Sequence, residues 1–87
     1  MTFRKGGAAR RRDANEPAII DALESIGCRV WQLHGRGTPD LLVYRGDRYI
    51  PMEVKSHTGA QTEAQRDTPW PIVRTVEAAI RVVGGLR

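Results

Sequence analysis

The chain has 87 residues, a length that suits one domain and leaves no room for a second. Its formal net charge of +4 favours a polyanionic partner such as a nucleic acid. The single cysteine, Cys28, excludes an intrachain disulfide and a cysteine-rich zinc site. No stretch approaches the ~18 apolar residues of a membrane span, and the first residues lack the hydrophobic region of a secretion signal. The sequence therefore predicts an intracellular protein that contacts no membrane.

Residues 1–12 are mostly glycine, alanine and basic residues, and they end in Arg10-Arg11-Arg12. This composition predicts a flexible basic tail that precedes a domain over residues 13–87. Two interpretations of the three arginines stay open: a solvated chain end, or an arm that contacts the phosphates of a nucleic acid.

A first helix is predicted to follow the tail. Asp13 or Asn15 can cap it, and Pro17 favours Asn15 because proline is tolerated only in the first turn. Apolar residues then recur at helical spacing, at Ile19, Ile20, Leu23 and Ile26. Gly27 ends the helix. Glu16 lies at the end of this core-facing stripe, where a carboxylate complements the helix dipole.

A first strand is expected over residues 28–33, followed by the loop His34-Gly35-Arg36-Gly37. The two glycines let a backbone approach a ligand closely, and Arg36 can contact a phosphate. A plain turn explains the glycines equally well. Arg36 and Gly37 are therefore candidate nucleic-acid contacts.

Two further strands are predicted over residues 41–44 and 49–54. Between them lies Gly46-Asp47, a dipeptide typical of a two-residue hairpin loop. With this loop, the register of the hairpin places Asp40 directly opposite Glu53.

Side chains alternate along a strand, so one face of this hairpin is continuously apolar and belongs in a core. Its residues are Leu41, Val43, Ile50, Met52 and Val54. The other face carries Asp40, Glu53 and Lys55 at the open end of the hairpin. Two carboxylates directly opposite each other destabilise a sheet, so a cation is expected between them. The residues favour either a surface ion-pair cluster or a site for Mg²⁺, which takes oxygen ligands and activates water at a phosphodiester.

The chain after Lys55 predicts a loop, a short helix, a last strand and a last helix. The short helix starts near Thr62, where Thr62 and Gln65 have the pattern of a capping box, and two prolines at 69 and 71 truncate it. The strand covers residues 72–74. Thr75 caps the last helix, whose apolar stripe is Val76, Ala79, Ile80 and Val83. These elements predict an α/β domain of order α-β-β-β-α-β-α, in which helices flank a mixed sheet.

Pro39-Asp40 followed by Glu53-Val54-Lys55 resembles the signature of the PD-(D/E)xK nuclease superfamily. The wider string, from Asn15-Glu16 through Gly37-Thr38-Pro39-Asp40 to Lys55 and Gln65, resembles the virus-type replication-repair nuclease (VRR-NUC) family. The resemblance covers roughly residues 13 to 84. It implies a restriction-endonuclease-like fold and a Mg²⁺- or Mn²⁺-dependent deoxyribonuclease that leaves a 5′-phosphate and a 3′-hydroxyl. The truncated helix after Gln65 departs from the longer helix that is usual in the family.

The resemblance also assigns roles to individual residues. The site residues that it implies are Asp40, Glu53, the backbone carbonyl of Val54, Lys55, Glu16 and Gln65. The two hairpin carboxylates and the carbonyl hold the metal, and Glu16 is a further candidate ligand. Lys55 orients or helps to deprotonate the attacking water and stabilises charge on the phosphate. The capping role and the active-site role of Gln65 both stay open.

The expected function is a structure-specific DNA endonuclease of replication, repair or recombination, including phage-type systems. Its substrates would be branched, flap or four-way junction DNA, and it would need no small-molecule cofactor. A small homodimer could place two sites across a junction of two-fold symmetry. The alternative is a non-catalytic nucleic-acid-binding module that keeps the fold. The two carboxylates argue against this alternative, because a pure phosphate binder gains nothing from them.

Overall fold

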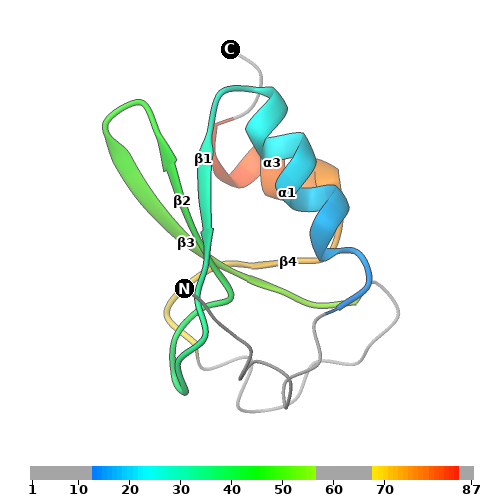
Figure 1. Cartoon of the computed structure of the whole chain (residues 1–87), viewed down its shortest axis with the longest axis vertical. Coiled ribbons are helices and arrows are strands. Elements are labelled where there is room, and N and C mark those ends of the chain that lie inside the picture. The colour runs from blue at the N-terminus through cyan, green and yellow to red at the C-terminus, as the bar shows by residue number, and fades with distance from the viewer. Residues whose placement is uncertain (1–12, 57–67, 85–87) are drawn as a thin grey trace.

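The computed structural model describes residues 13–56 and 68–84, which form a small α/β unit (Figure 1). The elements in chain order are α1 (Glu16–Ser25), β1 (Arg29–Gln32), β2 (Leu41–Arg45), β3 (Arg48–Val54), β4 (Ile72–Val73) and α3 (Val76–Val82). The strands form one 4-stranded mixed sheet in the order β1-β2-β3-β4. The predicted tail over residues 1–12 and the predicted helix near Thr62, with Gln65, lie outside the described residues.

The first helix has the predicted start and end. Asn15 occupies the N-cap position and Pro17 lies in the first turn. At the other end, Gly27 has a φ of 98°, which a glycine adopts without strain. The amide of Gly27 donates to the carbonyl of Glu24, and the amide of Cys28 donates to that of Leu23. These two hydrogen bonds form a Schellman motif, which turns the chain directly into β1.

The hairpin of β2 and β3 has the predicted register. Arg45 pairs with Arg48 across the two-residue loop, in which Gly46 has a φ of 66°. The ladder continues to the pair of Leu41 and Met52. One further step along both strands sets Asp40 opposite Glu53.

The last strand joins the sheet in parallel with β3. The amide of Glu53 donates to the carbonyl of Pro71, and the amide of Lys55 donates to that of Val73. The strand was predicted over residues 72–74, but it ends at Val73. The carbonyl of the next residue, Arg74, accepts a side-chain hydrogen bond from Asn15.

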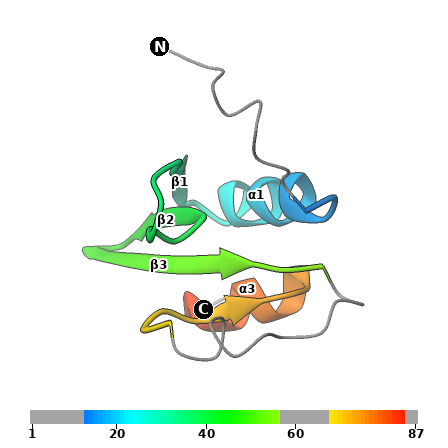
Figure 2. The same cartoon turned by 90° about the horizontal axis from the view of Figure 1, so that it is seen from below.

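Both described helices pack on the same face of the sheet, so the described residues make two layers (Figures 1 and 2). One core lies between the layers and contains Ile19, Leu23, Cys28, Leu41, Val43, Met52, Val54, Val73, Ala79 and Val83. The predicted apolar face of the hairpin is thus confirmed. The prediction of flanking helices is confirmed for this face, and no described helix covers the other.

The last helix begins as predicted at Thr75, whose hydroxyl accepts a hydrogen bond from the amide of Ala78 at 3.0 Å.

None of the helices in the described part of the chain has the length and apolar content that crossing a bilayer requires.

The positive φ of Gly46 makes the hairpin loop sensitive to substitution. A Cβ at this position would meet no atom within 4 Å, so the cost of Gly46→Ala comes from the backbone alone. We expect it to lower the free energy of unfolding by about 1–2 kcal/mol, measured by urea denaturation. Gly46→Asn should cost less, because asparagine tolerates the left-handed region better. Equal losses in the two variants would contradict this account of the loop.

Candidate active site

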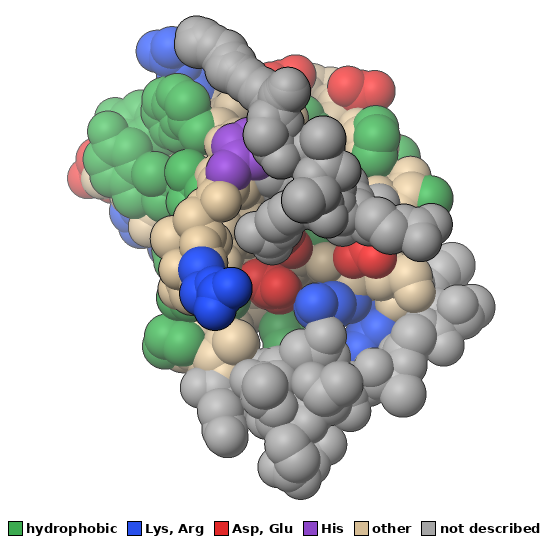
Figure 3. Space-filling view, turned by 60° about the horizontal axis from the view of Figure 1, so that its bottom comes forward, with side chains coloured by type: hydrophobic (Ala, Val, Ile, Leu, Met, Phe, Trp, Pro, Cys, Tyr) green, Lys and Arg blue, Asp and Glu red, His purple; other side chains and the backbone are tan. Residues whose placement is uncertain are grey.

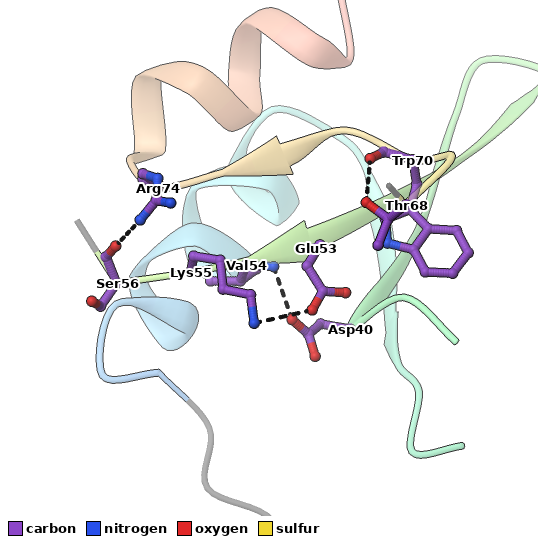
Figure 4. Close-up of polar contacts among 8 residues, drawn as sticks. All are labelled: Asp40, Glu53, Val54, Lys55, Ser56, Thr68, Trp70 and Arg74. Atoms are coloured by element: carbon purple, nitrogen blue, oxygen red, sulfur yellow. Dashed lines mark hydrogen bonds and ion pairs between the residues drawn. The ribbon is translucent and has the colours of Figure 1, made fainter. Parts of the chain in front are cut away.

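Two carboxylates lie close together at the end of the β2–β3 hairpin that is opposite its loop. Asp40 directly precedes β2 and is only 9% exposed, and the side chain of Glu53 in β3 is 16% exposed. Figure 4 shows both carboxylates beside each other, with the side chain of Lys55 extended towards them. The predicted convergence of these three side chains is therefore present in the structure.

A hydrogen bond from the backbone holds Asp40 in place. The amide of Val54 donates to Oδ2 of Asp40 at 2.9 Å (Figure 4). The amides of Glu53 and Lys55 point to β4, so the amide and carbonyl of Val54 point to the opposite side, where β2 has already ended. The Asp40 carboxylate thus replaces the strand carbonyl that this amide would otherwise meet.

The proline before Asp40 explains why the pairing stops at this point. In the hairpin register, the residue that would pair with Val54 is Pro39, which has no N–H to donate. Position 39 therefore offers no donor to the carbonyl of Val54. The result is a carbonyl oxygen directed to the same side of β3 as the Asp40 carboxylate.

Lys55 supplies the positive charge of the site. Its Nζ lies 3.4 Å from Oε2 of Glu53, and the Lys55 side chain is 26% exposed. An ion pair this accessible contributes at most about 1 kcal/mol to stability. The pairing therefore matters more for where it places the ammonium than for the stability of the fold.

The backbone around Lys55 is fixed on several sides. The amide of Lys55 donates to the carbonyl of Val73 at 3.0 Å, and its carbonyl accepts from Nδ2 of Asn15 at 3.0 Å. The guanidinium of Arg74 donates to the carbonyl of Ser56 at 2.6 Å (Figure 4). These bonds join the end of β3 to α1 and to the residues at the end of β4.

Asn15 has a different role from the predicted one. It occupies the N-cap position, but its side chain accepts no capping hydrogen bond. Instead its Nδ2 donates to the carbonyls of Lys55 and Arg74, at 3.0 and 2.8 Å. These partners are 40 and 59 residues away in the chain, so no local pattern could have indicated this role.

Glu16 lies at the buried end of the helix stripe, as predicted, with 1% of its surface exposed. Nε2 of Gln32 in β1 donates to its Oε2 at 3.1 Å. Gln32 is an exposed residue of β1, and no pattern in the sequence indicated this contact. Among residues 13–56 and 68–84, no group of three or more His, Cys, Asp or Glu side chains is arranged for a metal. The described structure thus does not group Glu16 with Asp40 and Glu53.

The other predicted nucleic-acid contacts fall in two places. Arg36 and Gly37 are exposed in a turn, where Thr38 hydrogen-bonds through its hydroxyl to the carbonyl of Gly35 at 2.6 Å. Gly37 has a φ of 77°, so the turn itself accounts for this glycine. The tail arginines, Arg10-Arg11-Arg12, and the predicted site residue Gln65 lie outside the described residues.

The donor chemistry of the site suits a hard divalent cation. Asp40, Glu53 and the carbonyl of Val54 offer oxygen atoms only, and Mg²⁺ is commonly bound by one or two carboxylates with waters and substrate phosphate. On the molecular surface, acidic side chains lie beside Lys or Arg side chains near the centre of Figure 3. Such a surface can hold a cation and present it to an anionic substrate.

Comparisons of the chain with models of protein families, with curated proteins and with solved structures find no match.

Cys28 lies apart from this site, in the core, and is 6% exposed. Burial raises the pKa of its thiol, and the neighbouring Arg45 guanidinium lowers it in part. A thiol that stays protonated is a poor nucleophile. The interpretation of Cys28 as a small buried hydrophobic residue agrees with this environment.

We expect the Cys28 thiol to react slowly with a disulfide reagent in the native protein and rapidly in urea. In urea, the reaction rate should rise with pH around a midpoint near the usual thiol pKa of ~8.5. Folding raises the pKa of this thiol, so the rate of the native protein should rise only at higher pH. Cys28→Ser should show no reaction. Equal rates with and without urea would contradict the burial of this thiol.

The two bonds donated by Asn15 make a prediction opposite to that of a helix cap. Asn15→Ala leaves two carbonyls without their donor and should lower the free energy of unfolding by about 1–3 kcal/mol. Asn15→Asp should cost more, because a carboxylate would face those carbonyls. Asp is a good N-cap residue, so a capping role alone would make Asn15→Asp nearly neutral.

Urea denaturation measures both variants against Ala18→Asp, which adds the same charge at an exposed position of α1. That control should change the stability by less than about 1 kcal/mol. A neutral Asn15→Asp variant would show that the two long-range bonds contribute little.

Proposed function

We propose that the chain is a metal-dependent deoxyribonuclease of the PD-(D/E)xK superfamily and the VRR-NUC family. The observation that supports this best is the convergence of Asp40, Glu53 and Lys55 at one end of β3, with Asp40 fixed by the Val54 amide. Metal-dependent hydrolysis of a phosphodiester needs carboxylates that hold the metal and a nearby positive charge. The two carboxylates and the ammonium of this site are groups of these kinds. An α/β unit with a mixed sheet is compatible with the restriction-endonuclease-like fold.

In this proposal, Asp40, Glu53 and the carbonyl of Val54 would hold Mg²⁺ or Mn²⁺. A bound cation supplies charge that polarises the phosphate and makes an attached water more acidic. The hydrogen bond from the Val54 amide keeps the Asp40 carboxylate turned towards this position. The burial of Asp40 strengthens its electrostatic interactions, because little water screens them.

The task of Lys55 is to place a proton donor next to the reacting phosphate. Its ammonium, 3.4 Å from Glu53, can orient the attacking water and donate a hydrogen bond to a phosphate oxygen as negative charge grows there. A group stabilises a transition state best when it needs no rearrangement. The hydrogen bonds at the amide and the carbonyl of Lys55 fix the backbone that carries this side chain, and the ion pair with Glu53 directs its ammonium.

The substrate and the assembly follow from the resemblance and form part of the same proposal. The substrate is DNA that is branched, flapped or joined in a four-way junction, and the acting species is an intracellular homodimer. The net charge of +4 supports a polyanionic substrate. The resemblance also implies Glu16 and Gln65 as site residues, but the described structure does not group Glu16 with the carboxylate pair, and Gln65 lies outside the described residues.

Cleavage assays with labelled duplex, flap and four-way junction DNA test this function. Asp40→Asn and Lys55→Ala should each lower the rate by at least about 100-fold, because each removes a charge from the reacting centre. Asn at 40 keeps an oxygen that can accept from the Val54 amide, so this variant should fold. Asp47→Asn removes the same charge at the exposed hairpin loop and should cleave like the wild type.

Calorimetric titration with Mn²⁺ gives a readout that does not depend on cleavage. The wild type and Lys55→Ala should bind the ion, and Asp40→Asn should bind it much more weakly. Cleavage by Asp40→Asn close to the wild-type rate would overturn the proposed chemistry. Binding of DNA without cleavage or a specific metal site would support the non-catalytic module instead.

A further inference from the structure

The face of the sheet that no described helix covers carries a cluster of aromatic rings. Alternation along the strands puts Trp31, Tyr44 and Tyr49 on this face, opposite the core residues. Trp31 is 40% exposed and Tyr49 is 63% exposed, and these are the large hydrophobic side chains that the described structure leaves exposed. We refer to the three rings together with Arg29 as the aromatic patch.

The rings of the patch contact one another in a continuous row. The centroids of Tyr44 and Tyr49 are 4.8 Å apart, and those of Trp31 and Tyr49 are 6.3 Å apart. The guanidinium of Arg29 lies 5.5 Å from the centroid of the Trp31 ring. A row of rings, of which Trp31 and Tyr49 are exposed, with an arginine over one of them offers flat π-faces and a positive charge on one surface.

The aromatic patch is on the same face of the hairpin as the proposed active site. Tyr49 and Glu53 are four residues apart in β3, which corresponds to about 13 Å along the strand. This distance is roughly the length of four stacked nucleotides. Figure 3 shows exposed hydrophobic side chains gathered at the left of the view and acidic ones at its centre, on one side of the molecule.

We propose that the aromatic patch binds an unpaired nucleic-acid strand by stacking its bases, next to the site where the phosphodiester is cleaved. Bases stack on exposed aromatic side chains with little dependence on sequence, and arginine adds cation–π and phosphate contacts. The inference rests on the proposed nuclease function. It specifies the substrate as DNA with a single-stranded segment adjoining the cleaved bond.

The position of the patch favours a nucleic acid over a protein partner. A protein that covered these rings would extend over the same sheet face towards Asp40 and Glu53, and would close the site to its substrate. A strand of DNA has to reach that site in any case. The charge of Arg29 and the net charge of +4 complement the phosphates of such a strand.

Equilibrium binding of a fluorescein-labelled dT oligonucleotide tests the proposal, in EDTA and at low salt so that no cleavage occurs. Trp31→Ala and Tyr49→Ala should each weaken binding by roughly 5- to 150-fold, the range measured when a stacking ring is removed. Tyr49→Phe keeps the ring and should bind within about twofold of the wild type. Arg81→Ala, at an exposed position of α3 in the helical layer, is the control for a lost charge alone.

Tryptophan fluorescence reports on the patch directly. The chain has 2 tryptophans, so Trp70→Phe leaves Trp31 as the only one. Addition of the oligonucleotide to this variant should quench the emission of Trp31 over the same concentration range as the binding curve. Unchanged emission at saturating oligonucleotide would overturn the proposal.

The two hypotheses fail in different ways. If the wild type cleaves no DNA, and the Trp31→Ala and Tyr49→Ala variants bind dT more weakly than the wild type, the patch proposal is supported and the nuclease function fails. If the wild type cleaves DNA and both variants bind dT normally, the nuclease stands and the patch proposal is wrong. Sedimentation that shows a dimer in the wild type and a monomer in Trp31→Ala, with dT binding unchanged, would make the patch a protein interface instead.

Discussion

The hydrogen bond between the Val54 amide and the Asp40 carboxylate is the contact on which the proposed site depends. It forms where the backbone ladder of β2 and β3 stops. There the Asp40 side chain accepts the hydrogen bond from Val54 that a backbone carbonyl at Pro39 would otherwise accept. The same geometry turns a carboxylate and a carbonyl to one side of β3 and leaves Glu53 and Lys55 on the exposed face. The site is in this sense an interrupted hairpin, and its chemistry comes from backbone groups as much as from side chains.

The hydrogen bonds that stabilise the fold also fix the geometry of the proposed site. The Asn15 side chain joins the start of α1 to the ends of β3 and β4, and the Arg74 guanidinium holds the carbonyl of Ser56. The core lies on one side of the sheet only, so the polar ends of the strands are held by such side-chain bonds rather than by a second layer of described helices. A small domain thus obtains rigidity where its hydrophobic core does not reach.

Local rules were sufficient for the hairpin, because the loop and the alternation of side chains together fix the register at Asp40 and Glu53. The end of α1 at Gly27 was predictable for the same reason, since the Schellman motif involves neighbouring residues. The two partners of Asn15 were not predictable, because they become its neighbours only after the strands have paired. The hydrogen bond from Gln32 to Glu16 was not predictable either: Glu16 was placed on the core-facing stripe of the helix, but its partner depends on how α1 packs against β1.

The tether formed by Asn15 also has a consequence for the synthesis of the chain. The Nδ2 group of Asn15, just before the first helix, bonds the carbonyls of Lys55 and Arg74, and Arg74 is synthesised after Asp40 and Glu53. A nascent chain can form the hairpin but cannot yet fix Lys55 between its neighbours. The order in which the chain is made therefore places this tether after the hairpin, because both of its acceptor carbonyls must be present.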